Sequence, residues 1–213
     1  MLGIHDLSLF VVSGLLLAMS PGPDTAYIVG RSSQLGRSGG AIAVLGIATG
    51  ICVHILCAAA GVSALLLTSA KAFNLIKLAG AAYLLYLGLK LLVSKSDRSV
   101  VPDTGGQPAG TATKVFWQGF LTNVLNPKVA LFFLAFLPQF IAVGTGSKTA
   151  SFLFLGLIFN MVGTSWNLLV AFVTAHVAKR VRRENLLSLW VNRALGGLFI
   201  YMGVRLVVAR QAK

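Results

Sequence analysis

Two charged side chains lie inside apolar stretches of this sequence, where a hydrophobic segment ordinarily carries none. Asp24 follows the residues SPGP at 20–23, and Lys128 follows the residues NP at 126–127. A charge that faces lipid at the centre of a bilayer costs at least ~2.5–3.5 kcal/mol. We therefore expect both side chains to face a polar cavity or each other, which makes them the first candidates for chemistry in this chain.

Proline residues interrupt the helix beside each of these charges. Pro21 and Pro23 precede Asp24, and Pro127 precedes Lys128. Because proline has no backbone N–H, each one leaves a carbonyl group of the preceding helical turn without its usual donor. Such a carbonyl is costly in hydrocarbon, so it must face protein, water or a ligand. Each break also begins a new helix whose N-terminus attracts anions, so we expect the two breaks to form part of the site.

Three interpretations of the two charges compete. In the first, they line a polar cavity and handle a zwitterion, with Asp24 taking the ammonium group or a proton and Lys128 taking the carboxylate. In the second, they only pair with each other and hold two halves of the protein together. In the third, Asp24 is merely a helix-start residue near the cytoplasmic end. The side chains expected to bind substrate or protons are Asp24, Lys128, Asn126, Asn123, Asn160 and Asn167, and the helix-break motif comprises Ser20, Pro21, Gly22, Pro23 and Pro127.

Composition places most of the chain out of water. Of the 213 residues 56% are hydrophobic and 11% are charged, and the mean hydropathy is +0.84, whereas soluble domains carry about 25% charged residues. Crossing the hydrocarbon takes about 20 apolar residues. Six such segments lie at 7–30, 40–67, 72–93, 115–143, 152–177 and 190–208. The sequence therefore predicts an all-α integral membrane protein with six transmembrane helices.

The six segments divide into two halves of a single domain, 1–213. Residues 94–114 are rich in Gly, Pro, Ser and Thr and are expected to form a flexible linker between the pseudo-repeats 1–93 and 115–213. The similar sequences YLGLKL and YMGVRL close the third and sixth segments, although chance could produce two such helix ends. Because each half has three spans, the halves must be inverted in the membrane, a common plan of secondary transporters. The first helix of each half would then carry a proline break.

Basic residues outnumber acidic ones by 18 to 5, which gives a net charge of +13. Such a charge first suggests nucleic acid as a partner. The basic residues lie at the ends of apolar segments rather than along one polar face, so nucleic-acid binding is not expected. Most of the 18 fall on the side that holds the first, third and fifth loops. That side should be cytoplasmic by the positive-inside rule, and both termini should then be periplasmic.

Three further features of the predicted helices have more than one explanation. Asn167 lies two helical turns after Asn160, so the two side chains share a face and can either line the cavity or bond between helices. The run CVHILC at 52–57 resembles a metal-ligand cluster, but packing explains it better because its first cysteine lies well away from the other two side chains. Glycines in the run GIATG at 46–50 allow close helix packing, within one chain or between chains.

Three stretches resemble the LysE/RhtB family of bacterial amino-acid exporters: MSPGPDTAYI, GFLTNVLNPKVALFFLAFLPQF and LAGAAYLLYLGLKLL. The resemblance covers nearly the whole chain and places residues 21–24 in the first family signature and 126–128 in the second. It implies a small inner-membrane protein that expels amino acids or their derivatives, driven by the proton gradient. The family's substrates include basic, neutral and branched amino acids and homoserine, so the resemblance does not select one.

The expected function is secondary active export of an amino acid by alternating access around the two breaks, with Asp24 coupling a proton to substrate movement. No enzyme activity is expected, because the predicted spans hold no paired carboxylates and the histidines are scattered. A metal-cation exporter, a passive channel and a non-transporting accessory subunit are the alternatives. The expected partners are the amino acid, protons and the bilayer, without a cofactor or a bound metal. The sequence leaves open the amino acid, the coupling ion, a homo-oligomer and whether Asp24 and Lys128 touch.

Overall fold

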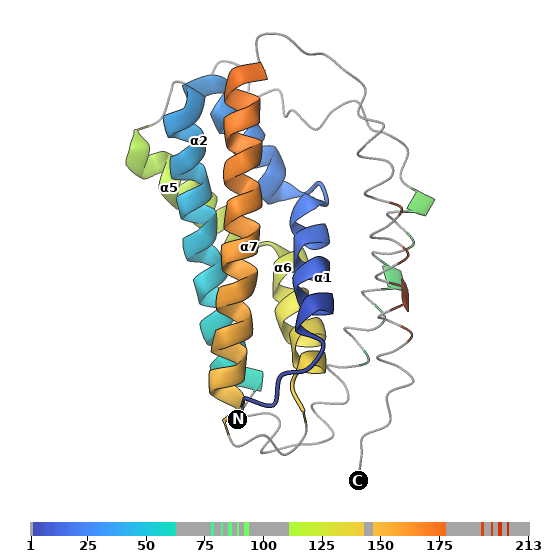
Figure 1. Cartoon of the computed structure of the whole chain (residues 1–213). Helices are drawn as coiled ribbons and strands as arrows, with labels where there is room; N and C mark the ends of the chain where they lie inside the picture. The colour runs from blue at the N-terminus through green and yellow to red at the C-terminus, as the bar shows by residue number, and fades with distance from the viewer. Residues whose placement is uncertain are drawn as a thin grey trace.

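The computed structural model describes residues 2–62, 111–142 and 147–177, together with isolated helical positions within 78–93 and 193–204. Apart from one isolated β-bridge between Ile4 and Ile141, the regular structure of these residues is helical, which confirms the all-α class there. The helices pack side by side as a bundle (Figure 1). Their bounds are α1 Leu7–Met19, α2 Pro23–Cys57, η1 Ala58–Val62, α5 Ala112–Val124, α6 Pro127–Leu131, η2 Phe132–Phe136, η3 Leu137–Phe140 and α7 Lys148–Val177.

Several of the described helices are long and apolar enough to cross a membrane. Pro23–Gly61 and Lys148–His176 meet that condition singly, and Ala112–Val124 with Pro127–Phe140 would make a third span bent by 46° at its break. These helices agree with the predicted integral membrane protein. The predicted third and sixth spans, most of the linker between the halves and the repeated sequences that close each half lie largely outside the described residues.

Helix α2 is a hairpin of two arms, where the sequence had suggested a loop between two spans. Gly36 interrupts the helix with φ 69° and ψ −157°, a conformation that is essentially restricted to glycine. The first arm rises from the break to this bend and the second returns beside it (Figure 1). Both arms reach the same residue of α5, since Asn123 bonds to Asp24 of the first arm and to His54 of the second. The bend thus brings two parts of α2 to one site.

The two broken helices run in opposite directions through the bundle (Figure 1). The chain just before α1 lies beside the end of η3, where the His5 backbone N–H donates to the Phe140 carbonyl at 3.1 Å. The first arm of α2 lies along α5, where the Tyr27 hydroxyl donates to the Val115 carbonyl at 2.7 Å. Helices α1 and α5 each have 13 residues before the break. Both breaks therefore meet inside the bundle.

Glycines bring the second arm of α2 into close contact with α5. A Cβ atom at Gly50 would lie 2.8 Å from the Cβ of Asn123, and one at Gly119 would lie 2.7 Å from the Ala43 carbonyl oxygen. A Cβ at Gly46 would collide with the backbone of α5 in the same way. The close packing predicted for the run at 46–50 therefore occurs within one chain, and it fixes the position of Asn123.

Phenylalanine side chains fill the bundle between the breaks and the end where the N-terminus lies. Phe132 stacks on Phe159 of α7 with 4.6 Å between ring centroids, and Phe10 of α1 meets Phe140 edge-on at 5.2 Å. Such aromatic pairs contribute about 0.5–1.5 kcal/mol beyond the area that they bury. We call this set the phenylalanine cluster; its members are Phe10, Phe132, Phe133, Phe136, Phe140 and Phe159, and each is buried.

Candidate functional site

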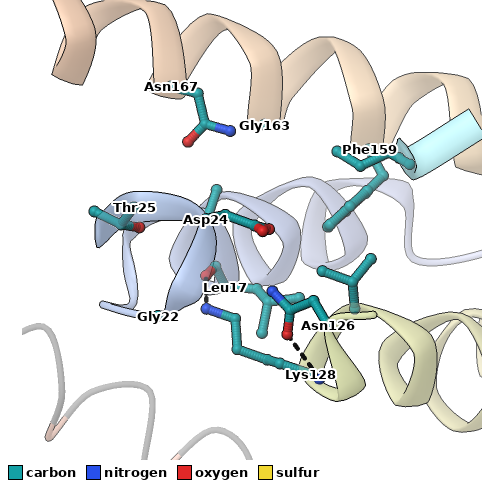
Figure 2. Close-up of a pocket in the computed structure, with 12 residues that line it drawn as sticks. Leu17, Gly22, Asp24, Thr25, Asn126, Lys128, Phe159, Gly163 and Asn167 are labelled. Atoms are coloured by element: carbon teal, nitrogen blue, oxygen red, sulfur yellow. Dashed lines mark hydrogen bonds between the residues drawn. The ribbon is translucent and has the colours of Figure 1, made fainter. Parts of the chain in front are cut away.

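Lys128 binds two carbonyl groups at the end of α1, one of which has lost its helical donor to a proline. Its Nζ donates to the carbonyl oxygens of Leu17 and Ser20, both at 3.0 Å, and Figure 2 shows the ammonium reaching from α6 to the end of α1. In an unbroken helix the N–H of residue 21 would bond to Leu17, but Pro21 has none. A cation at a helix C-terminus is also favoured by the helix dipole. Lys128 therefore acts as the cap of α1.

The second break is completed by one side chain from α2 and one from the break itself. Pro127 leaves the Asn123 carbonyl without its helical donor, and His54 Nε2 donates to that oxygen at 3.0 Å. Asn126 caps α6, since its Oδ1 accepts from the Lys128 backbone N–H at 3.0 Å. Proline at the first helical position needs no donor, so Pro127 fits the start of α6 well. Each break is thus completed by a local backbone N–H, from Ser20 at the first and Asn126 at the second, together with a side chain from a distant helix.

Asp24 lies in the first turn of α2, at the point where the two breaks cross. Asn123 is fully buried, and its Nδ2 donates to Asp24 Oδ2 at 2.8 Å. Three neighbouring buried atoms have no hydrogen-bond partner among the described residues: Asp24 Oδ1, Asn123 Oδ1 and Asn126 Nδ2. Leaving a buried polar group unpaired costs about 1–3 kcal/mol. The cluster therefore has spare capacity to accept and to donate hydrogen bonds.

Asp24 and Lys128 do not form an ion pair in this conformation. The ion pair among the described residues joins His5 and Asp6, near the N-terminus. Asp24 and Lys128 line the same cavity (Figure 2), but the ammonium is held by carbonyl groups of α1. Asp24 does start a helix, as one of the sequence interpretations held, but that helix starts inside the bundle.

The cavity between the breaks is small. Its volume is about 30 Å³, enough for one or two water molecules and too little for an amino acid. Figure 2 shows Asp24, Asn126 and Lys128 converging on it, with Gly163 and Asn167 of α7 on the opposite wall. The described residues that line it are Leu17, Ala18, Gly22, Asp24, Thr25, Ile51, Asn126, Lys128, Val129, Phe159, Gly163 and Asn167. This conformation is therefore closed around the polar cluster.

The two asparagines of α7 have different surroundings in the structure. Asn167 is buried and lines the cavity. Asn160 instead bonds α7 to α2, since its Nδ2 donates to the Ala48 carbonyl at 3.2 Å and to Cys52 Sγ at 3.3 Å.

The run at 52–57, which resembles a metal-ligand cluster in sequence, has one of its cysteines, Cys57, exposed. Within the described part of the chain, no group of three or more His, Cys, Asp or Glu side chains is arranged to hold a metal ion.

Sequence reasoning missed a polar stripe that continues from the site along the first arm of α2. Arg31 follows the first predicted span, where a basic residue is ordinarily solvated, but it is only 8% exposed and donates to Gln118 Oε1 of α5 at 2.7 Å. Asp24, Tyr27 and Arg31 are spaced i, i+3 and i+7, which places them on one helix face. That spacing is the signal that could have revealed the stripe.

Comparison with known proteins gives matches over nearly the whole chain. The model of the family described as LysE type translocator matches residues 15–210. An uncharacterized membrane protein of Pseudomonas aeruginosa is 31% identical over 210 residues, which cover 98% of this chain and 97% of that protein. A leucine efflux protein of Enterobacter sp. (strain 638) is 30% identical over 205 residues, 96% of each chain, and one of Salmonella typhimurium is 29% identical over 205 residues, 96% of this chain and 95% of the relative. No solved structure gives a significant match.

Proposed function

The chain belongs to the LysE type translocator family, and we propose that it is a secondary active exporter of small amino acids or their derivatives across the bacterial inner membrane. The family match, the relatives named leucine efflux proteins and the apolar helices all support a transporter rather than an enzyme. Leucine is the first substrate to test, because it is the one that those relatives' names give.

The polar cluster at the crossing breaks is the observation that carries this proposal. An amino acid presents an ammonium and a carboxylate, and the cluster offers a partner for each. Asp24 Oδ1 is buried without a hydrogen-bond partner and suits the ammonium. Asn126 Nδ2 is likewise unpaired, and Lys128 has three N–H donors of which two are used, so both can donate to the carboxylate. Charged hydrogen bonds of this kind are the strong ones.

Asp24 is the proposed carrier of the coupling proton. An ionisable side chain within a membrane segment marks a proton or substrate pathway by default. When it is ionised, Asp24 binds the ammonium of the substrate; when it is protonated, the neutral side chain lets the substrate-free protein return. Because the two ligands compete for one carboxylate, protons and amino acid move in opposite directions.

Movement between outward and inward states is proposed to occur at the two breaks. Prolines have removed the helical hydrogen bonds there, so a bend costs less than elsewhere in the helices. The small cavity must widen to admit an amino acid, and release of the α1 carbonyl groups by Lys128 would permit α1 and α6 to separate. Alternating access around a fixed site at broken helices is a recurring plan of secondary transporters.

The complete transporter is proposed to have six transmembrane helices in two inverted halves, 1–93 and 115–213, with both termini periplasmic. The equal length of α1 and α5 before their breaks and their opposite directions support the inverted arrangement of the first helices. The orientation is inferred from the distribution of Lys and Arg alone.

Transport by purified protein in liposomes tests this function. Liposomes with an acidic interior are diluted into alkaline buffer that contains one radiolabelled amino acid, with leucine first in the panel. We expect accumulation that depends on the pH gradient, because protons leaving the liposome would drive the amino acid inward. If no amino acid accumulates under a gradient of either sign, the protein is not a proton-coupled amino-acid exporter.

A further inference from the structure

A second cavity lies against the first arm of α2, outside the closed site. It is an open groove of about 540 Å³ between this arm and α5, within the size range of small-molecule binding sites. The described residues that line it are Pro23, Tyr27, Arg31, Gln118, Leu121, Thr122, Leu125 and Asn126. We call it the Arg31 groove. Asn126 lines both cavities, so the groove ends at the closed site.

Arg31 is the charged group of this groove, and its described partners are neutral. Its guanidinium donates to Gln118 Oε1 at 2.7 Å and to Gln34 Oε1 at 3.1 Å, and its Cζ lies 5.4 Å from the centre of the Tyr27 ring. No carboxylate of the described residues lies within ion-pair distance of it. A guanidinium has five N–H donors, so this one retains donors for an anion.

A purely structural role for Arg31 would carry a free-energy cost, because its charge is buried. A buried charge within a membrane protein is normally paired or faces a water-filled pathway. The ring of Tyr27 and the side-chain oxygen of Gln118 hold the guanidinium at the edge of the groove, which fixes it in place before a ligand binds. The planar fork of a guanidinium matches a carboxylate, with two parallel N–H···O bonds. The apolar side chains of Leu121 and Leu125 lie along the same groove and suit an aliphatic side chain.

We propose that the Arg31 groove is a loading site for the exported amino acid, in which Arg31 binds the substrate carboxylate before the substrate passes Asn126 to the site between the breaks. This inference rests on the proposed export function and adds to it a second binding position. The groove runs along the first arm of α2 from Pro23 at the break to Arg31, in the direction of the bend at Gly36. That end of the arm is predicted to be cytoplasmic, the side from which an exporter takes its substrate.

Concentration-dependent leucine uptake by Arg31→Gln liposomes tests the role of the guanidinium. Loss of a charged hydrogen-bond pair should raise the apparent KM about tenfold, more than it lowers the maximal rate. Arg31→Lys keeps the positive charge but loses the planar guanidinium, so its apparent KM should lie between those of the wild type and Arg31→Gln. Arg37→Gln is the matched control, because Arg37 is exposed in the same bend and lies over the Phe172 ring at 4.4 Å. Its KM should change less than about twofold.

Protection from thiol labelling tests the groove with Arg31 intact, so that its outcome does not depend on the folding of an Arg31 variant. Thr122→Cys, in a background with both native cysteines replaced by alanine, is labelled with a maleimide in the presence of leucine or leucinamide. Leucine should slow labelling, whereas leucinamide, which lacks the carboxylate, should not at the same concentration.

The outcomes separate the loading site from the export function. If the wild type transports leucine but Arg31→Gln keeps the wild-type KM, or if leucinamide protects Thr122→Cys as well as leucine does, the loading site is wrong and export stands. If the wild type transports no amino acid, export fails and the loading site fails with it.

Discussion

The two cavities that meet at Asn126 each contain polar side chains but differ greatly in size. The cavity between the breaks has about 30 Å³, whereas the Arg31 groove has about 540 Å³. One is closed by Lys128, which reaches across to α1, and the other is open along α5. The two cavities therefore follow one another on either side of Asn126, and the space is narrow between the breaks and wide along α5.

The opposite side of the closed cavity is apolar. Phe159 lines that cavity and stacks on Phe132, and the phenylalanine cluster continues from there to the end of the bundle near the N-terminus. A path for an amino acid in that direction would require these rings to separate. The conformation is therefore asymmetric, with an open groove on one side of the breaks and packed aromatic rings on the other.

The largest expected effect comes from Asp24→Asn, which removes the proposed proton carrier at nearly constant volume. Accumulation of leucine against its gradient should fall to the background level, because an amide cannot exchange a proton. The measurement is uptake over a series of external pH values in the liposomes described above. An Asp24→Asn protein that accumulates leucine with unchanged pH dependence would remove Asp24 from the coupling mechanism.

Lys128→Met should both destabilise the protein and abolish transport. Leaving the Leu17 and Ser20 carbonyls without the ammonium costs about 1.5–3 kcal/mol for each, or about 3–6 kcal/mol together, which corresponds to a fall in Tm of roughly 6–24 °C. The Tm is measured by thermal unfolding in detergent. Lys114→Met is the control, since that lysine is exposed at the start of α5. Equal Tm values for the two variants would show that Lys128 is not the cap of α1.

Gly50→Ala should disturb the closed site from outside. The added methyl group would lie 2.8 Å from the Asn123 Cβ, and such overpacking costs about 1–3 kcal/mol. Because Asn123 holds Asp24, transport should fall along with Tm. Gly30→Ala is the matched control on the other arm of α2, where nothing lies within 4 Å of the new atom. Wild-type transport by Gly50→Ala would mean that the position of Asn123 is not critical.

The smallest effect is expected from Asn160→Ala, and the comparison is with Asn167→Ala on the same helix. It removes hydrogen bonds to α2 that contribute about 0.5–1.5 kcal/mol each, so Tm should fall slightly and the KM for leucine should stay the same. Asn167→Ala, on the cavity wall, should raise that KM. A larger KM for Asn160→Ala than for Asn167→Ala would place the substrate elsewhere along α7.

The positions of the two helix breaks could be predicted from the sequence because prolines and charges are conspicuous inside apolar segments. The helix ends at Met19 and restarts at Pro23, and it ends again at Val124 before Pro127, as a missing N–H requires. That each break leaves carbonyls in need of a partner could also be predicted. These properties depend on local chemistry alone.

The partners of those carbonyls could not be predicted, because they depend on how distant segments pack. Lys128 and His54 reach their acceptors from 111 and 69 positions away along the chain. The Arg31 groove was missed for a related reason, since a basic residue near a predicted loop is ordinarily solvated. That side chain is buried where the first arm of α2 packs against α5, and there it contacts Gln118.

Filling the cavity between the breaks tests most directly whether that cavity holds the exported amino acid. Gly163 lines it, and a Cβ atom there would meet nothing within 4 Å, so Gly163→Leu should occupy the cavity without unfolding the protein. Gly30→Leu adds the same side chain at a glycine with equally open surroundings, away from the cavity lining. With Tm unchanged in both variants, we predict that binding and transport of radiolabelled leucine are lost in Gly163→Leu and retained in Gly30→Leu. Wild-type binding and transport by Gly163→Leu would contradict a substrate site between the two breaks.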